Sequence, residues 1–232
     1  MSNYLEQKAQ ESAYNIQAYD LKNRKKNPYL PLRVIEDFFE APELWRSFAL
    51  KQEYYGPEFE VFPGKRSKPL HELDLEVFDS FARTLQRNIP KCSGFRDLAV
   101  RFHTVDETFV RGWIHDDDPG INLAGLVYLN KDAPLGSGTS FYDDQLDSMA
   151  EQMHMLIQRD IFELTPDQRL EIEEHRQAHR NNFKVNAVVE NVFNRCITFD
   201  PRVWHAPDNF FGKTLEDSRL TLVFYAVVDY YG

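Results

Sequence analysis

Cysteines and long apolar runs are both scarce in this sequence. Its 232 residues include only two cysteines, Cys92 and Cys196, and both lie in apolar surroundings. A disulfide framework is therefore not indicated, and we expect a cytoplasmic protein. No stretch approaches the roughly 18 consecutive apolar residues of a membrane-spanning helix. The opening MSNYLEQKAQESAYN lacks the apolar segment of a secretory signal, so we expect neither secretion nor insertion into a membrane.

Positive charge is also in deficit. Lys and Arg number 27 against 37 Asp and Glu, which gives a net charge of -10. This balance argues against nucleic acid and anionic membranes as partners. A short basic cluster lies within residues 22–26, and we interpret it as part of a solvated polar segment covering residues 1–30, with a binding patch as the alternative.

Apolar residues are abundant enough to bury a full core. The hydrophobic fraction is 42% and the aromatic fraction 14%, which predicts a single domain over residues 31–232. A strand is expected over Leu32–Phe39, and a helix opening at Pro42 should turn Leu44, Trp45, Phe48 and Ala49 inward. Leu73, Val77, Phe78, Phe81 and Leu85 then follow helical spacing, in a helix that ends near Asn88.

Strand patterns dominate the rest of the chain. Asp97–Val105 and Phe109–Ile114 read as a hairpin, and further strands are expected over Ile121–Leu129, Gly138–Tyr142, Lys184–Phe193, Arg195–Phe199, Val203–Ala206 and Arg219–Val228. Helices followed by mostly antiparallel strands predict an α+β, mainly β fold: a β-sandwich or jelly roll with N-terminal supporting helices packed outside.

A helical insertion interrupts the strands at about residues 143–183. Its first helix carries a narrow apolar stripe that includes two methionines, Met149 and Met153, and its second is charged nearly all round. We expect such a stripe to pack against another apolar surface, since short isolated helices are only marginally stable in water. Three roles fit the pattern: a lid over a substrate mouth, a subunit contact that would make a homodimer, or a helical pair covering the outer sheet.

Polar residues at one corner suggest a metal site. His115 and Asp117 are two residues apart at the expected end of a strand, so their side chains should share a face while Asp116 points away. His205 follows a tight turn near the C-terminus, and Arg219-Leu220-Thr221 opens the last strand. Among other histidines, His103 is expected to be a satisfied core residue or a support of the site, and His175 and His179 to lie on a solvated helix.

These motifs together resemble the 2-oxoglutarate and iron(II)-dependent oxygenases, in particular their prolyl 4-hydroxylase-like branch. The matching segments, in order, are His115-Asp116-Asp117, Tyr128-Leu129-Asn130, Gly138-Thr139-Ser140-Phe141, Asn194–Phe199, His205 and Arg219-Leu220-Thr221. The resemblance implies a double-stranded β-helix that holds Fe(II) through His115, Asp117 and His205. It also implies that Arg219 pairs with the far carboxylate of 2-oxoglutarate, with Thr221 on the same strand face and Tyr128 as a hydroxyl donor.

Two spacings depart from the family pattern. His205 comes 88 residues after Asp117, a gap we attribute to the helical insertion. Arg219 follows His205 by 14 residues, a longer step than in the prolyl hydroxylase branch, which Asn209–Lys213 should fill as a loop. Lys213 is therefore the alternative cation for the cosubstrate.

The function implied by the resemblance is that of a dioxygenase using Fe(II), 2-oxoglutarate and dioxygen. It would hydroxylate a peptide, an amino acid or a small metabolite and release succinate and CO2. Two other classes stay open. A non-catalytic jelly-roll or cupin-like module could keep the fold without turnover, and a zinc hydrolase could use the two histidines and the aspartate around a metal-bound water.

Overall fold

The fold rests on two antiparallel β-sheets. The structure, a computed structural model, describes residues 32–56, 63–109, 112–117, 120–144, 180–181 and 183–231. The larger sheet has the strand order β1-β7-β4-β9-β3-β2 and the smaller one β6-β5-β8. The strands are β1 (Arg33–Ile35), β2 (Lys65–Arg66), β3 (Cys92–Val105), β4 (Leu123–Tyr128), β5 (Thr139–Asp144), β6 (Phe183–Val189), β7 (Cys196–Phe199), β8 (Trp204–Pro207) and β9 (Arg219–Tyr230).

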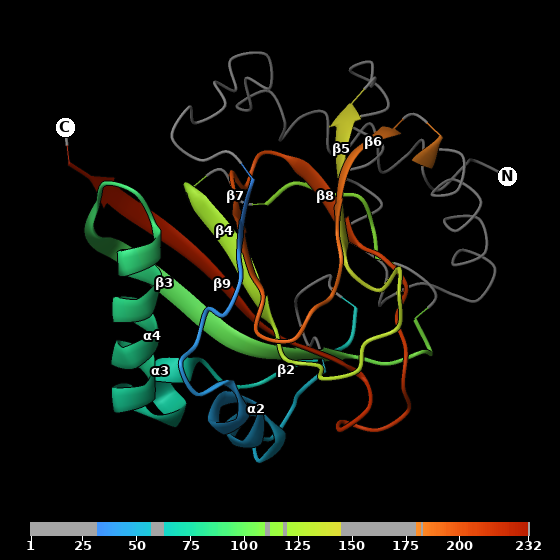
Figure 1. The fold of residues 1–232 in the computed structure, drawn as a ribbon, viewed down its shortest axis with the longest axis horizontal. Helices are drawn as coiled ribbons and strands as arrows, with labels where there is room; N and C mark the ends of the chain where they lie inside the picture. The colour runs from blue at the N-terminus through green and yellow to red at the C-terminus, as the bar shows by residue number, and fades with distance from the viewer. Residues whose placement is uncertain are drawn as a thin grey trace, which may run out of the picture.

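Three helices cover one face of the six-stranded sheet, and the three-stranded sheet lies on the other side (Figure 1). They are α2 (Pro42–Leu50), α3 (Leu70–Leu73) and α4 (Leu75–Asn88). Asp74 caps α4 by accepting hydrogen bonds from the backbone N–H groups of Glu76 and Val77, and the helix ends at Asn88 as predicted. A mainly β architecture with N-terminal helices packed outside is thus confirmed.

Helix α2 starts at the predicted proline but buries a narrower face than expected. The Trp45 ring stacks on Phe39 with centroids 4.1 Å apart, and Ala49 is fully buried. Leu44 is 70% exposed, so the prediction that it points inward is wrong. It lies at the edge of the apolar stripe, outside the contact that Trp45, Phe48 and Ala49 make with the core.

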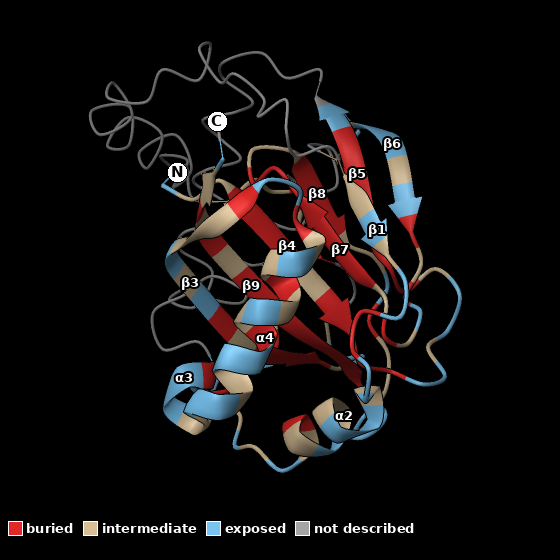
Figure 2. Ribbon diagram, turned by 60° about the vertical axis from the view of Figure 1, so that its left-hand side comes forward, coloured by how far each residue is buried: buried red, intermediate tan, exposed pale blue. Residues whose placement is uncertain are grey.

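The two faces of the six-stranded sheet pack against different parts of the molecule. On the helix side, alternate residues of β9 and β4 join the main core. This helix-side core includes Phe81, Leu85, Val100, Phe102, Leu123, Val127, Leu220, Leu222, Phe224 and Ala226, and Figure 2 shows the buried strands beneath the helices. On the other side, Ala124 and Tyr128 pack with Phe141, Val189, Ile197 and Phe199 between the two sheets.

Gly125 lies where β4 passes closest to its neighbours. A Cβ atom there would come within 2.4 Å of both the Ile197 carbonyl oxygen and the Phe224 ring. Only glycine permits this approach, so the ring of Phe224 fills the space beside β4 on the helix side.

The predicted hairpin between Asp97–Val105 and Phe109–Ile114 is wrong. Strand β3 pairs with β9 along its whole length, and at its C-terminal end Thr104 and His103 also pair with Lys65 and Arg66 of β2. Because both edges of β3 are occupied there, the segment leading to His115 pairs with β8 instead.

Other predicted strands are present with shifted ends. The polar segment 1–30 and nearly all of the insertion at about 143–183 lie outside the described residues; the roots of the insertion continue β5 up to Asp144 and begin β6 at Phe183. In the portion of the chain that is described, no helix is long and apolar enough to cross a membrane.

Candidate metal centre and adjoining cavity

Two short backbone pairings bring the His115 segment against β8. His115 and His205 exchange both backbone hydrogen bonds, each 2.9 Å long, and the N–H of Asp117 donates to the Pro201 carbonyl at 2.8 Å. Directly opposed residues of an antiparallel pair project to the same face. The two imidazole centroids therefore lie 4.3 Å apart, although the residues are 90 positions apart in the chain.

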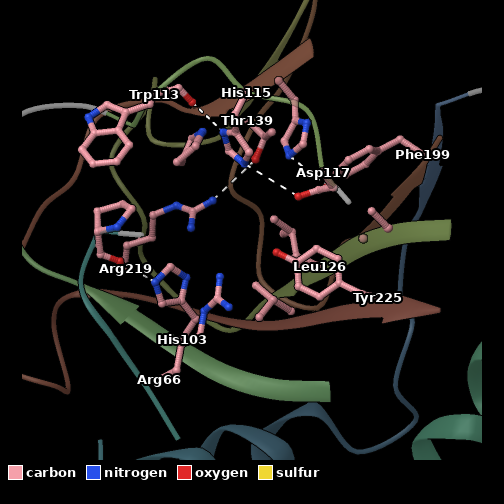
Figure 3. A pocket seen from close by; sticks show the side chains of 16 residues that line it. Arg66, His103, Trp113, His115, Asp117, Leu126, Thr139, Phe199, Arg219 and Tyr225 are labelled. Carbon is pink, nitrogen blue, oxygen red and sulfur yellow. Dashed lines mark hydrogen bonds and ion pairs between the residues drawn. The ribbon is translucent and has the colours of Figure 1, made fainter. Parts of the chain in front are cut away.

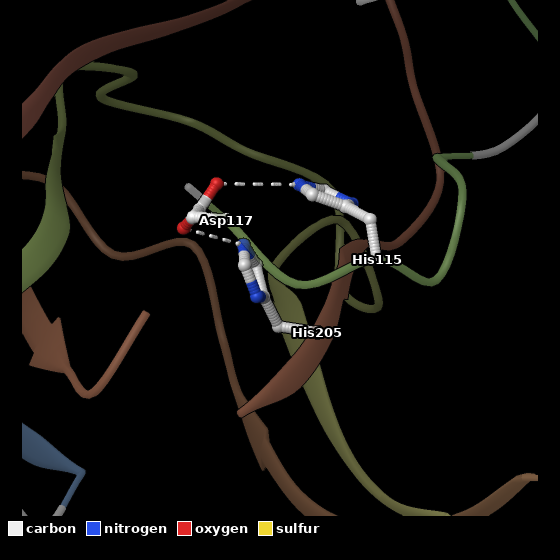
Figure 4. Close-up of side chains that lie close together, drawn as sticks. All are labelled: His115, Asp117 and His205. Atoms are coloured by element: carbon white, nitrogen blue, oxygen red, sulfur yellow. Dashed lines mark ion pairs between the residues drawn. The ribbon is translucent and has the colours of Figure 1, made fainter. Parts of the chain in front are cut away.

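The three predicted ligands converge on one point (Figure 4). One ligand atom from each of His115, Asp117 and His205 lies within 4.8 Å of the other two. Nε2 of His115 is 3.9 Å from Oδ1 of Asp117, and Nε2 of His205 is 3.6 Å from Oδ2. Asp116 is not part of this cluster, as the alternation of side chains predicts.

The backbone selects the tautomer of both histidines. Nδ1 of His115 lies 2.7 Å from the Trp113 carbonyl oxygen, and Nδ1 of His205 lies 2.9 Å from that of Val203. Since a carbonyl oxygen only accepts, each Nδ1 must carry the proton and donate. Each Nε2 then directs its lone pair towards Asp117, which is the arrangement of metal-binding histidines with a fixed outer hydrogen bond.

Burial keeps the His205 imidazole neutral. Its ring lies among aromatic side chains, 4.6 Å from the Phe199 centroid and 6.3 Å from that of Phe141. Desolvation, and secondarily the neighbouring His115, hold the pKa of His205 well below its usual value. Two imidazoles and one carboxylate, with room left beside them, fit a divalent first-row transition metal held on one face.

A cavity of about 120 Å³ adjoins the triad (Figure 3). Its apolar walls come from both sheets and from the segment before His115: Trp113, Ala124, Gly125, Leu126, Phe199, Pro207, Val223 and Tyr225. Among the described residues, the basic side chains that line it besides the triad are Arg66, His103 and Arg219. The cavity thus joins a candidate metal-binding cluster to two arginines.

Arg219 is the deeper of these two arginines. It is 2% exposed at the start of β9 and reaches across to β5, where Nε is 3.4 Å from the Ser137 carbonyl oxygen and Nη2 is 3.5 Å from Oγ1 of Thr139. Burial lowers its pKa, and the nearby Tyr128 and Asp208 offset part of that effect. No carboxylate from the described residues lies within ion-pair distance of its guanidinium group.

Lys213, the alternative cation, points away from the cavity. Its side chain is 76% exposed, and Nζ lies 3.4 Å from Oε1 of Glu107. The loop between β8 and β9 carries it to the surface, so the structure corrects that alternative.

Tyr128 and Thr221 lie beside Arg219 but do not line the cavity. Tyr128 is fully buried, with its ring centroid 5.6 Å from Cζ of Arg219 and its hydroxyl 2.7 Å from Oγ1 of Thr139. The Thr221 hydroxyl instead donates to the His103 carbonyl oxygen at 3.4 Å. Tyr128 therefore acts on the cavity through Arg219 and Thr139, and Thr221 through the pairing of β3 with β9.

The cavity residues that were not predicted include Thr139, Trp113 and Arg66. Thr139 lies inside the Gly138–Phe141 motif, so the motif could have indicated it, and Trp113 immediately precedes the His115 corner. Arg66 lies in β2, which is only two residues long and leaves no periodic signal in the sequence. His103, expected in the core or in support of the site, lines the cavity with Nε2 at 2.6 Å from the Pro63 carbonyl oxygen.

Solved structures of similar fold include HygX from Streptomyces hygroscopicus with nickel and 2-oxoglutarate bound. It is 13% identical, with a TM-score of 0.53 over 94% of this chain and 86% of HygX. HygX with iron bound gives 12% identity and a TM-score of 0.51 over the same shares. A prolyl-4-hydroxylase from Pseudomonas putida, 13% identical over 98% of this chain and 100% of its own, has a TM-score of 0.47.

The resemblance to 2-oxoglutarate and iron(II)-dependent oxygenases is thereby confirmed at the level of the fold, on the HygX structures. No curated protein sequence matches the chain. A family model covers residues 15–222, most of the chain and the whole of the triad. The chain belongs to the family of unknown function DUF6445.

Proposed function

We propose that the chain is an Fe(II)- and 2-oxoglutarate-dependent dioxygenase with the double-stranded β-helix architecture. The observation that supports this most is the meeting of a His-Asp-His cluster and a buried arginine in one cavity. The bound nickel, iron and 2-oxoglutarate of HygX, which shares the fold, support the same assignment.

His115 and His205, through Nε2, and Asp117, through its carboxylate, are the proposed iron ligands. When bound, iron(II) with 2-oxoglutarate activates dioxygen, so that one oxygen atom enters the substrate and the other enters succinate as CO2 leaves. The outer hydrogen bonds to the Trp113 and Val203 carbonyls hold the two rings in place. Phe199 and Phe141 exclude water from the His205 side.

Arg219 is the proposed partner of the far carboxylate of 2-oxoglutarate. A guanidinium group binds a carboxylate with two parallel, charge-assisted hydrogen bonds. An uncompensated buried charge costs about 3–5 kcal/mol. Arg219 makes two long hydrogen bonds and lies over the Tyr128 ring, and Asp208 offsets only part of the effect of burial, so Arg219 favours an anionic ligand. Thr139 stands beside it with its hydroxyl held by Tyr128, ready to add a third polar contact.

The oxidised molecule, or prime substrate, is proposed to be a peptide, an amino acid or a small metabolite that receives a hydroxyl group. It would reach the metal from the side of the cavity lined by Trp113 and Arg66. The proposed unit is one domain over residues 31–232, with the helical insertion at about 143–183 connecting β5 to β6.

The direct test is cosubstrate turnover. The full chain is loaded anaerobically with Fe(II), exposed to dioxygen, and assayed for CO2 and succinate from 2-oxoglutarate, with His205→Ala as the control. We expect slow turnover without prime substrate, and none in the control. A chain that binds iron and 2-oxoglutarate without turnover, even with candidate substrates, would be a binding module. A chain that neither binds nor turns over 2-oxoglutarate but hydrolyses esters or amides with Zn(II) would be a hydrolase.

A further inference from the structure

The two histidines of the triad are held in different ways. His205 belongs to β8, which pairs with β5 from Trp204 to Pro207. His115 lies in the segment 112–117, which among the described residues pairs with β8 through one bridge, between His115 and His205. The His115 side chain is also more open, with 30% of it exposed against 9% for His205. The position of His115 therefore depends more on the contacts that its own short segment makes.

A glycine lets this segment lie directly on the end of β8. A Cβ atom at Gly112 would lie 2.2 Å from Cγ and 2.5 Å from the carbonyl oxygen of Pro207. Any residue other than glycine would therefore push the segment and the strand apart. Because Pro207 also lines the cavity, the Gly112 backbone is packed against a residue of the cavity wall.

Arg180, near the C-terminal end of the predicted insertion, holds the carbonyl group of the same glycine. Its Nη2 donates to the Gly112 carbonyl oxygen at 2.7 Å, a charge-assisted hydrogen bond between residues 68 positions apart. Arg180 also lies near Asp208, which follows Pro207. Burial raises the pKa of the Asp208 carboxyl, and the charge of Arg180 is among the effects that lower it. The guanidinium group therefore lies where the segment meets the end of β8.

The carbonyl that Arg180 holds is one peptide unit away from the carbonyl that orients His115. The Gly112 carbonyl belongs to the rigid peptide unit that leads to Trp113, and the Trp113 carbonyl accepts the Nδ1 proton of His115 at 2.7 Å. Anchoring the first carbonyl restricts the direction of the second. A chain of contacts thus runs from Arg180 through the backbone to the His115 ring, whose Nε2 belongs to the triad.

We propose that Arg180 is a positioning residue for the His115 ligand and acts through the backbone of Gly112 and Trp113. This inference rests on the proposed function and deepens it, because it connects the end of the predicted insertion to the metal centre. Contacts outside the ligands favour metal binding by holding each ligand in its binding geometry. The Trp113 side chain lines the cavity (Figure 3), so the same contact also fixes part of the cavity wall.

The first measurement is calorimetric titration of nickel(II) into the metal-free full chain. Loss of an outer partner of a metal-binding histidine weakens metal binding about ten- to a hundredfold. Arg180 acts one step further from the metal, so Arg180→Gln should weaken nickel(II) binding roughly tenfold, the lower end of that range. Arg180→Lys keeps a charged donor and should restore part of the affinity.

Hydrogen exchange of the metal-free chain gives a second readout that does not involve the metal. The His115 N–H donates to the His205 carbonyl at 2.9 Å, so its exchange rate reports how firmly the segment lies on β8. Arg180→Gln should speed this exchange. The amides of β9, which pairs with strands on both sides, should exchange as in the wild type. This comparison separates loosening of the segment from loss of overall stability.

Gly112→Ala is the second variant, because it pushes the same segment away from Pro207 and leaves Arg180 in place. It should also weaken nickel(II) binding and speed the exchange of the His115 amide. Lys184→Gln is the matched control, since it removes a positive charge four residues from Arg180, from an exposed side chain of β6. It should change neither measurement.

Two results would overturn the inference. Arg180→Gln could bind nickel(II) and exchange the His115 amide as the wild type does, or it could lose no more affinity than Lys184→Gln. In both cases nickel(II) binding by the wild type would leave the proposed function standing. A wild type that does not bind nickel(II) would contradict the proposed function and this inference with it.

Discussion

The two faces of strand β9 differ in the effects that substitutions on them should have. Leu220, Leu222, Phe224 and Ala226 are all fully buried against the helices, and together they form a closed apolar layer. Arg219, Val223 and Tyr225 alternate with them and line the cavity. One face of β9 therefore contributes to the stability of the fold, and the other face contributes side chains to the cavity. Substitutions one residue apart should then change different properties.

The largest expected effect is on the cavity side, at the triad. His115→Ala, Asp117→Ala and His205→Ala should each abolish binding of Fe(II) and turnover, because each removes one of the three proposed ligands. Metal content by elemental analysis and circular dichroism of the same samples check this, and the fold should stay largely intact.

Asp116→Ala is the matched control for the triad, since it removes a carboxylate from the residue next to Asp117. It should retain iron. Loss of iron in Asp116→Ala with retention in Asp117→Ala would contradict the assignment of the metal-facing carboxylate.

On the helix side, Phe224→Ala should cost about 3–5 kcal/mol of unfolding free energy, because it removes a fully buried ring. That ring packs 5.3 Å from the Phe81 centroid and beside Gly125. Denaturant unfolding measures the loss. Val223→Ala, one residue away on the cavity face, should lower the unfolding free energy distinctly less. Equal losses of unfolding free energy in the two variants would contradict the proposed difference between the faces.

Arg219→Gln should weaken 2-oxoglutarate binding by roughly ten- to a hundredfold, since a charge-assisted contact is lost. Iron binding should persist, because Arg219 is not part of the triad. Calorimetry of 2-oxoglutarate and metal analysis on the same sample separate these effects. Lys213→Gln removes an equal charge at the surface and should change neither.

Tyr128→Phe should give the smallest effect, a loss of cosubstrate affinity below that of Arg219→Gln. The Tyr128 hydroxyl contacts Thr139 at 2.7 Å and the Val189 carbonyl oxygen at 3.3 Å, so it supports the arginine pocket without lining the cavity. A loss equal to that of Arg219→Gln would mean that Tyr128 contacts the cosubstrate directly.

Much of the fold and of the candidate site could be predicted from the sequence, because strong local patterns indicate the elements involved. The C-terminal end of α4, the apolar run of β4 and the alternation at His115 and Asp117 follow from side-chain periodicity, whereas the break at Asp74 that separates Leu73 from α4 does not. The order of the motifs added His205, which no local pattern could place beside His115.

What the sequence did not reveal depends on contacts between distant strands. The segment before His115 was expected to pair with β3, but β9 and β2 already occupy both edges of that strand. Arg66 was hidden in a two-residue strand. Thr221 lies on the same face of β9 as Arg219, as expected. Its short side chain, however, hydrogen-bonds to the backbone of β3, whereas the side chains of Arg219, Val223 and Tyr225 reach the cavity.

The most direct test of the account compares 2-oxoglutarate with 2-oxovalerate, which has the same chain length but no far carboxylate. Both are titrated anaerobically into the Fe(II)-loaded wild type and Arg219→Gln. The account predicts metal-dependent binding, a strong preference for 2-oxoglutarate in the wild type, and loss of that preference in Arg219→Gln while 2-oxovalerate binding hardly changes. The same preference in both proteins, or binding that does not need the metal, would contradict it.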